Sequence, residues 1–331
     1  LHEKSRGLGD VYKRQVGTSP RRVRGRSANP EAGNVGPAMG RRYDTISFLS
    51  DYGTDDEFVG VVKSVIRELA PHATVIDLTH GIRPFDVRAG SLALARSISY
   101  VASGVVMAVV DPGVGTARRG IAVEVAGGEG VLIGPDNGLL APAVAMAGGA
   151  ERAIELDNPD HRFEAPGATF DGRDVFAPAA AALCTGVDLL ELGSEVDADL
   201  LFPGVVPLPQ IDDSIVIAQA LWIDRFGNVQ LNVGPDDLPA GLADIVEVRF
   251  SAPTDPTGGT TRAATRVASF AEVATGAVGL VIDSNGMLAL VMNQRSAADE
   301  LGIADGDQVV ITALADGGDS GMTVKVDLTT R

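Results

Sequence analysis

Cysteine and histidine are scarce in this sequence of 331 residues, which contains one cysteine and four histidines. A single cysteine excludes an intramolecular disulfide bond and a cysteine-based zinc site. The histidines are scattered, with no pair at the spacing of metal ligands. The one cysteine, Cys184, lies in an alanine-rich run that favours a small core residue over a nucleophile. We therefore predict neither a metal site nor a bound cofactor.

The sequence also lacks long apolar runs, and it has fewer basic than acidic residues. No apolar stretch reaches the roughly 18 residues of a membrane span, because Arg96 interrupts the longest candidate, residues 91–110. The net charge is −17, with +7 on residues 1–42 and −24 on the remainder. An acidic body binds nucleic acid poorly, although it suits a cationic small molecule. We expect a cytoplasmic protein that engages neither a membrane nor nucleic acid.

Residues 1–42 show no hydrophobic period and are rich in Arg, Gly, Ser and Pro. That composition cannot bury enough apolar surface to fold, so we predict a disordered extension. No apolar segment follows its charges, which argues against a signal peptide. We expect residues 1–38 to be a translation artefact and Met39 to stand near the true start. A basic arm that binds nucleic acid is the alternative.

The remaining chain divides at a proline-rich stretch, residues 202–213, which we predict to be a linker. Before it, residues 43–201 alternate between apolar runs and segments of helical period, which predicts an α/β domain with a largely parallel central sheet. After it, residues 214–331 have the period of short strands, which predicts an antiparallel β-barrel. The expected strands are residues 44–49, 74–78, 105–110, 121–125 and 131–133, then 214–222, 229–233, 246–250, 279–282, 288–291, 308–312 and 323–328; the expected helices are residues 57–70 and 86–101.

Two carboxylates directly follow predicted strands of the first domain. Asp111 ends a buried apolar run and enters a turn rich in Pro and Gly, with Arg118 shortly after it, while Asp51 follows the opening strand. In open α/β sheets ligands bind beyond the carboxyl ends of the strands, and a carboxylate there can accept hydrogen bonds from a ribose diol. The alternative is that these side chains only cap local amides. No complete dinucleotide fingerprint or phosphate-binding loop occurs, which argues against a Rossmann dehydrogenase or a P-loop nucleotidase.

Further stretches carry candidate binding residues. Phe85 follows a proline and is either an aromatic wall for a planar ligand or a core residue. Gly172, next to Asp171 in the stretch ATFDGRDVFAP, allows a ligand to approach the backbone closely. In the second domain, the stretch IDRFGNV places Asp224 and Asn228 where they either hold a zwitterion or form a turn.

Seven motifs occur in order between residues 43 and 328: SDYGTDDEFVG, DLTHGIRPFDVRAG, VVDPGVGTARR, GPDNGLL, TFDGRDVFAP, IDRFGNV and DSNGML. Together they resemble the family of S-adenosylmethionine (SAM) hydroxide adenosyltransferases and the related chlorinases and fluorinases. The resemblance implies an N-terminal α/β domain, a C-terminal β-barrel, and a homotrimer whose sites lie between one subunit's first domain and a neighbour's second. It also implies SAM as the substrate, with water attacking the 5′ carbon to release adenosine and L-methionine.

The resemblance assigns roles to individual residues. Asp51 would bind the ribose hydroxyls, and Phe85 and Phe170 would form apolar walls. The second domain would contact the methionine, ribose and adenine ends of the substrate through Asp224, Phe226, Asn228, Ser284 and the backbone near Asn293.

The family's hydrolases carry an Asp–Arg–His set around the attacking water, and this chain matches two of its members, Asp111 and Arg118. The family motif reads TFHGRD, whereas Asp171 stands here at the position of the histidine. We predict that Asp111, oriented by Arg118, deprotonates the water, with Asp171 as a second acceptor; two close carboxylates raise the pKa of one of them. The fluorinase has a tyrosine at the position of Asp111 and a serine at that of Gly172. The alternatives are a halogenase of the same family and a SAM- or adenosine-binding protein without activity.

Overall fold

The computed structural model describes residues 43–212, 215–239, 242–251 and 260–314. The chain divides into two compact units between Val206 and Pro207. This division falls inside the expected linker, residues 202–213, although the domain limits themselves stay a prediction. The expectations for residues 1–42 and for a strand at residues 323–328 lie outside the described residues.

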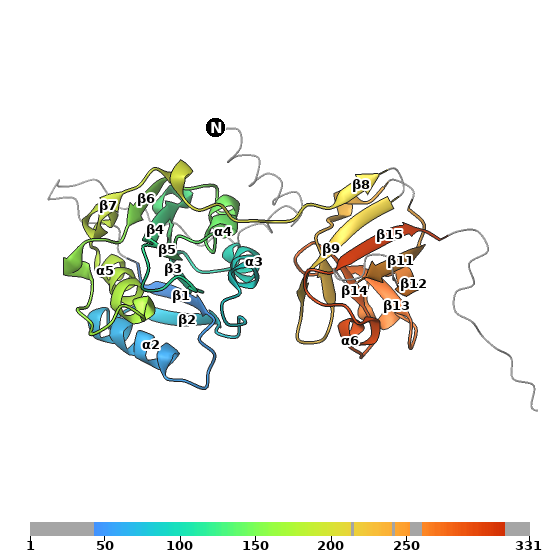
Figure 1. The fold of residues 1–331 in the computed structure, drawn as a ribbon, viewed down its shortest axis with the longest axis horizontal. Coiled ribbons are helices and arrows are strands. Elements are labelled where there is room, and N and C mark those ends of the chain that lie inside the picture. Colours follow the sequence, from blue (N-terminus) through green and yellow to red (C-terminus); the bar gives the residue numbers. More distant parts are fainter. Residues whose placement is uncertain (1–42, 213–214, 240–241, 252–259, 315–331) are drawn as a thin grey trace, which may run out of the picture. The chain divides into compact units, whose positions relative to one another are not determined.

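A seven-stranded sheet forms the centre of the first unit (Figure 1). Its order is β2-β1-β3-β5-β4-β6-β7, and the pairings make β2, β1, β3, β5 and β6 run in one direction and β4 and β7 in the other. The largely parallel sheet is thus confirmed, and β3 is buried along its whole length, as expected of a central parallel strand. The strands are β1 (Thr45–Ser50), β2 (Thr74–Thr79), β3 (Gly104–Val109), β4 (Gly120–Val125), β5 (Gly130–Pro135), β6 (Arg152–Glu155) and β7 (Ser194–Glu195).

Helices cover both faces of this sheet. Phe48 of β1 belongs to the core shared with α2 and α5, and its neighbour Leu49 to the core shared with α3 and α4, as side-chain alternation along a strand requires. Cys184 is fully buried in α5, which confirms that it is a core residue. Within the described ranges, none of the helices combines the length and apolar character needed to cross a bilayer. The helices are α2 (Phe58–Leu69), α3 (Val87–Ile98), α4 (Ala141–Met146) and α5 (Ala177–Thr185).

The order of the strands creates a switch point at the carboxyl ends of β1 and β3. From β1 the chain passes through α2 to β2 on one side, and then through α3 to β3 on the other side of β1. The two connections therefore leave the sheet in opposite directions, and ligands of open α/β folds bind in the crevice formed there. Asp51 directly follows β1 and Asp111 lies just beyond β3, so both candidate carboxylates stand at this switch point.

The second unit contains a closed barrel of seven strands (Figure 1). The ring runs β10-β14-β13-β12-β11-β15-β9 and closes by pairing of β9 with β10, while β8 extends the edge of β9. The barrel is confirmed, although it is mixed rather than wholly antiparallel, because β12 and β13 pair in parallel. The strands are β8 (Gln210–Asp212), β9 (Ile215–Ile223), β10 (Val229–Leu231), β11 (Ile245–Ser251), β12 (Thr260–Arg266), β13 (Val278–Ile282), β14 (Leu288–Val291) and β15 (Gln308–Ala313). The one α-helix described in this unit is α6 (Ala297–Leu301).

Strand β12 was missed by the sequence analysis for a physical reason. Its residues, TTRAATR, lack the alternation of apolar and polar side chains that marks a half-buried strand, and only Ala264 is buried. The strand exists because β11 and β13 supply hydrogen-bonding partners on its two sides. Tertiary pairing, rather than local pattern, therefore determines this element.

Candidate functional site

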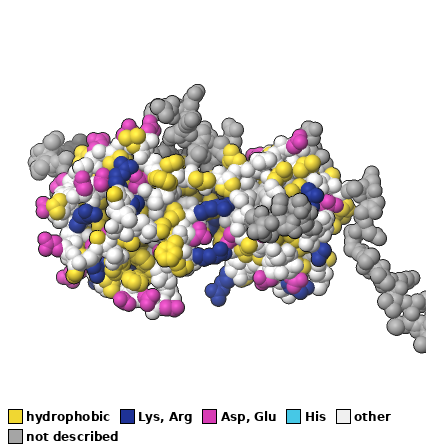
Figure 2. Space-filling model, viewed as in Figure 1, with side chains coloured by type: hydrophobic (Ala, Val, Ile, Leu, Met, Phe, Trp, Pro, Cys, Tyr) yellow, Lys and Arg dark blue, Asp and Glu magenta, His cyan; other side chains and the backbone are white. Residues whose placement is uncertain are grey.

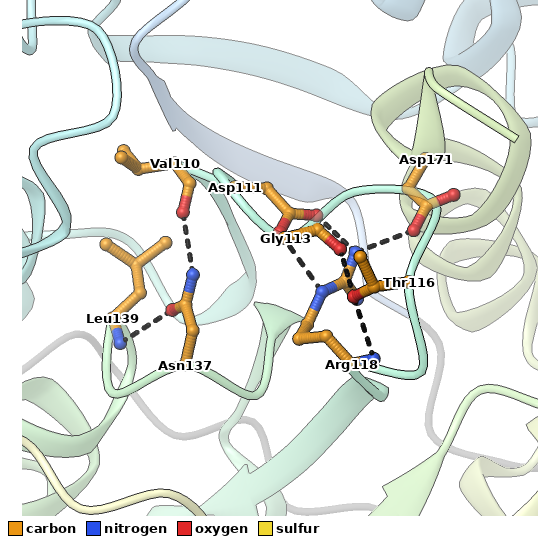
Figure 3. Close-up of polar contacts among 8 residues, drawn as sticks. All are labelled: Val110, Asp111, Gly113, Thr116, Arg118, Asn137, Leu139 and Asp171. Carbon is orange, nitrogen blue, oxygen red and sulfur yellow. Dashed lines mark hydrogen bonds and ion pairs between the residues drawn. The ribbon is translucent and has the colours of Figure 1, made fainter.

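Three charged side chains meet at the carboxyl edge of the first sheet (Figure 3). Asp111 lies just beyond β3, Arg118 in the loop before β4, and Asp171 immediately before a π-helical turn that leads into α5. The Nε of Arg118 donates to Asp111 Oδ1 at 3.1 Å, and its Nη2 donates to Asp171 Oδ2 at 2.7 Å and pairs with Asp111 Oδ2. One guanidinium thus joins both predicted acceptors, although Asp171 is far from the other two in sequence.

The cluster is largely shielded from solvent. The side chains of Asp111, Arg118 and Asp171 are 5%, 10% and 18% exposed. Burial raises the pKa of Asp111 above its ordinary value; Arg118 opposes this rise and the nearby Asp171 adds to it. The guanidinium also lies over the ring of Phe176, 5.7 Å from its centre. A carboxylate of raised pKa is suited to accept a proton near neutral pH.

Local turn chemistry fixes the loop that carries Arg118. The hydroxyl of Thr116 donates to the carbonyl of Gly113 at 2.6 Å and accepts from the N–H of Arg118 at 3.3 Å. Gly115 has φ +76°, and a β-carbon there would lie 2.7 Å from the carbonyl oxygen of Ala168. Only glycine fits this position without strain, so Gly115, the second glycine of the motif VVDPGVGTARR, is required by the backbone conformation.

The neighbouring strand β5 supports the same edge. Asn137 donates from Nδ2 to the carbonyl of Val110 at 2.9 Å and accepts from the N–H of Leu139 at 3.1 Å (Figure 3). Beside it, Asp136 Oδ2 accepts from Nε and Nη2 of Arg119 at 3.1 and 2.5 Å. The chain therefore contains two arginine–carboxylate pairs in adjacent positions, of which only the Arg118 pair includes a second carboxylate.

Asp51 is tied to both neighbouring loops. Its N–H donates to the carbonyl of Val109 at 3.3 Å, and its Oδ2 accepts from the N–H of Phe85 at 2.9 Å. Burial raises the pKa of Asp51, while hydrogen bonds from the backbone of Phe85 and from its own backbone oppose the rise. Phe85 has φ +70°, a left-handed conformation that is costly for a bulky residue, and its side chain is 72% exposed. The core alternative for Phe85 is therefore wrong, and its role as a wall stays a prediction.

His80 holds the loop that carries Asp51 at two points. Its Nδ1 lies 2.7 Å from Ser50 Oγ, which in turn accepts from the N–H of Tyr52 at 3.3 Å. The carbonyl of His80 accepts from the N–H of Gly53 at 2.8 Å. Both Ser50 and His80 are buried, so this loop is anchored from within the protein.

Tyr52 is the residue near the cluster that the sequence analysis did not single out. Its ring packs against those of Phe58 and Phe170, with centres 5.6 and 5.7 Å apart, so Phe170 belongs to an aromatic cluster. The phenol oxygen accepts from the backbone N–H of Gly172, and a β-carbon at Gly172 would overlap it. A protein side chain therefore lies against this glycine, and the close approach of a ligand expected there stays a prediction. The only sequence signal was the position of Tyr52 directly after Asp51 in a strand-end loop.

Three second-unit candidates lie in the turn between β9 and β10. Asp224 Oδ1 accepts from the backbone N–H groups of Phe226 and Asn228 at 2.8 and 2.9 Å, and its Oδ2 accepts from Asn228 Nδ2 at 2.8 Å. These bonds build the turn, and they leave the side chain of Phe226 77% exposed. The turn interpretation is confirmed, while contact of these residues with a ligand stays a prediction.

The other two candidates of the second unit lie beside β14. Ser284 is exposed in the turn that precedes β14. Asn293 follows this strand and donates from Nδ2 to the carbonyl of Val273 at 3.3 Å. Their roles in a common site with the first unit stay predictions.

Among the residues that the structure describes, no group of three or more His, Cys, Asp or Glu side chains is arranged to hold a metal ion. The expectations of no cofactor and of a cytoplasmic location stay predictions.

The fold and the site define a two-domain α/β protein with a carboxylate–arginine–carboxylate cluster at the switch point of its sheet. Residues 46–193 match the SAM hydroxide adenosyltransferase N-terminal domain, and residues 218–310 match the C-terminal domain of the same family. The chain belongs to this family.

Relatives of known name agree with this assignment. A protein of Salinispora tropica named (R)-S-adenosyl-L-methionine hydrolase is 42% identical over 81% of this chain and 97% of its own length. A Thermus thermophilus protein of the same name is 39% identical over 79% of this chain and 96% of its own length. A solved structure of an uncharacterized conserved protein from Thermotoga maritima is 33% identical, with a TM-score of 0.72 over 81% of this chain and 99% of that one. A fluorinase of an Actinoplanes species is 28% identical over 81% of this chain and 97% of its own length.

Proposed function

We propose that the protein hydrolyses SAM to adenosine and L-methionine, with water as the nucleophile at the 5′ carbon. The observation that carries this proposal is the bridging of Asp111 and Asp171 by Arg118 at the switch point of the sheet. The 42% identity to a named hydrolase supports it, whereas the fluorinase relative is 28% identical. Two carboxylates around the nucleophile also suit water better than a halide, because like charges repel.

The reaction needs little covalent help from the protein, because the sulfonium of SAM is already a good leaving group. The site has to hold one water in line with the C5′–S bond and accept its proton. As the water oxygen bonds to C5′, the C5′–S bond breaks and its electron pair moves to sulfur, which becomes the neutral thioether of methionine. Asp111 takes the proton, Asp171 accepts the other hydrogen of the water, and Arg118 holds both carboxylates in place.

Substrate contacts follow from the same geometry. One carboxylate oxygen of Asp51 is occupied by the N–H of Phe85, which leaves the other to accept from the ribose hydroxyls. Phe85 and Phe170 would wall the nucleoside. The remaining contacts would come from Gly172 in the first unit and from Asp224, Phe226, Asn228, Ser284 and Asn293 in the second.

The two named hydrolases carry the (R) form of SAM in their names, and we propose the same preference here. The test supplies each sulfur epimer separately and follows adenosine and methionine by chromatography. Equal amounts of both products, formed faster from the (R) epimer, are expected. Binding of either epimer without products would instead identify a binding protein, and a 5′-chloro nucleoside formed in added chloride would identify a halogenase.

We propose that the working form is a homotrimer whose sites combine the first unit of one subunit with the second unit of a neighbour. Figure 2 shows hydrophobic side chains gathered on the visible face of the first unit. Exposed apolar residues of this unit include Phe85, Leu200 and Phe202. Clusters of exposed apolar side chains on a protein surface are typical of protein–protein interfaces.

Mixing two inactive variants tests the shared site. Asp111→Asn removes the proposed base from the first unit, and Phe226→Arg places a cation beside the cationic substrate at an exposed position of the second. If neighbours complete each site, subunit exchange between these variants should restore about a quarter of wild-type activity, the share of sites with two intact halves. The control mixes Asp111→Asn with Arg118→Met, which affect the same unit and should restore nothing. Mixed trimers without recovered activity would contradict the shared site.

The pH dependence of activity should report Asp111. Because burial raises its pKa, kcat/KM should fall on the acid side with an apparent pKa above the ordinary value of about 3.9. The free energy of unfolding changes in the opposite sense. Because the pKa of Asp111 is higher in the folded protein than in the unfolded chain, protonated Asp111 stabilises the fold at a pH below the unfolded-state pKa. This contribution is lost as the pH rises through the folded-state pKa. The free energy of unfolding of the wild type, relative to Asp111→Asn, should therefore decrease between about pH 4 and neutral pH. Rate profiles and denaturant unfolding of both proteins measure the two effects.

A further inference from the structure

We propose that the phenol of Tyr52 is a further active-site group, which donates a hydrogen bond to the attacking water and selects water against larger nucleophiles. This inference rests on the proposed hydrolysis and deepens it. It concerns a residue for which the sequence motifs suggested no role.

The position of the phenol is fixed by packing on three sides. The ring of Tyr52 contacts those of Phe48, Phe58 and Phe170, with centres 6.4, 5.6 and 5.7 Å away. Its backbone N–H donates to the buried hydroxyl of Ser50 at 3.3 Å. A ring held in this way presents its hydroxyl in one direction, toward the start of the π-helical turn.

The hydroxyl stands among the charged groups of the site. Its oxygen accepts from the N–H of Gly172, and three carboxylates, those of Asp51, Asp111 and Asp171, act on it electrostatically. Burial and these carboxylates raise the pKa of Tyr52, so the phenol keeps its proton at neutral pH. Among the hydrogen bonds of the described residues, none uses the phenol proton of Tyr52, so this proton is available to a ligand or a water.

The phenol supplies the hydrogen bond that the attacking water still lacks. In the proposed mechanism the water donates its two hydrogens to Asp111 and Asp171, and one lone pair attacks C5′. The second lone pair needs a donor, and the proton of Tyr52 is the neutral donor beside these carboxylates. Tyr52 keeps its proton throughout: the O–C5′ bond forms, the C5′–S pair goes to sulfur, and the proton of the water goes to Asp111.

The same arrangement discriminates between nucleophiles. Methanol has one O–H, so it cannot donate to both carboxylates, and we expect its methyl group to compete with the phenol of Tyr52 for the space beside the attacking oxygen. Tyr52→Phe removes the phenol oxygen and leaves the ring in place. The variant should lower kcat about fivefold, the effect of one neutral hydrogen bond, with little change in KM. In water–methanol mixtures it should also raise the ratio of 5′-O-methyladenosine to adenosine about tenfold.

Two further variants separate this role from packing. Phe58 packs against the ring of Tyr52 and is 37% exposed. Phe58→Leu loosens this aromatic packing but keeps the phenol of Tyr52, so the variant should give the same product ratio as the wild type. Gly172→Ala places a β-carbon on the phenol oxygen and should reproduce the loss of kcat. In a Tyr52→Phe background the same alanine should lower kcat less than it does in the wild type, because the phenol oxygen, the atom nearest to its β-carbon, is already gone.

The outcomes distinguish the two proposals. If the wild type forms adenosine and Tyr52→Phe gives the same product ratio as the wild type, the role of Tyr52 is overturned and the proposed hydrolysis is not. An equal rise in the ratio for Phe58→Leu would assign the effect to packing and overturn it as well. A wild type that forms no adenosine would overturn the hydrolysis itself, and the role of Tyr52 with it.

Discussion

Asp111→Asn is expected to lower kcat for adenosine release by about 10²- to 10⁴-fold, the usual contribution of a general base. Asparagine keeps the size and one acceptor oxygen of the carboxylate but cannot take a proton from water. Arg118 keeps its hydrogen bond to Asp171, so the loop should stay in place. Steady-state kinetics with the purified variant, beside its unfolding curve, measure the effect.

Asp136→Asn is the matched control for that experiment. Asp136 pairs with Arg119 through the same two guanidinium nitrogens and is also buried, with 6% of its side chain exposed. It accepts from the backbone N–H of Phe202 instead of meeting a second carboxylate. We expect its loss to lower stability and leave kcat close to that of the wild type. A drop in kcat as large as that of Asp111→Asn would show that the first effect is structural.

Arg118→Met should lower both activity and stability. The methionine fills similar space but leaves Asp111 and Asp171 without their shared cation, and breaking a buried ion pair typically costs about 3–5 kcal/mol. We expect a loss of about 3 kcal/mol in the free energy of unfolding at neutral pH, together with kcat reduced at least about 100-fold as both acceptors lose their position. Denaturant unfolding and steady-state kinetics check the two parts.

The loss of stability in Arg118→Met should depend on pH. Arg118 holds down the pKa of Asp111, so its removal raises that pKa further. A raised folded-state pKa contributes stability that is present at acid pH and lost as pH rises, so the variant should approach the wild type near pH 4 and fall behind it toward neutral pH. Arg119→Met, which breaks the neighbouring Arg119–Asp136 pair, should be less stable than the wild type but should have a similar kcat. A deficit independent of pH would contradict the account of two uncompensated carboxylates.

Much of the fold could be predicted because local pattern and tertiary structure agree. The apolar run that ends at Asp111 is a buried central strand, and the helical period after Asp51 is α2. Since both strands run in the same direction, their carboxyl ends meet at one edge, and the two carboxylates could be placed there from sequence alone. The mixed pairing of β12 could not be predicted from sequence, because the neighbouring strands β11 and β13 determine this strand rather than its own residues.

The site was predictable where residues follow strand ends and not where tertiary contacts decide. The sequence placed Asp111 and Arg118 together because they share one loop. It could not show that Arg118 also bridges to Asp171, or that Tyr52 lies against Gly172, because these contacts join segments more than fifty residues apart. Helix α2 likewise begins after Glu57 without a side-chain cap, so no capping residue marks its start in the sequence.

A single turnover of (R)-SAM in oxygen-18 water tests the central claim most directly. The account predicts one heavy oxygen in the 5′ hydroxyl of the released adenosine and none in methionine, because water attacks C5′ while the C5′–S bond breaks. Adenosine that carries only ordinary oxygen, or a nucleoside that carries chlorine when chloride is present, would contradict it.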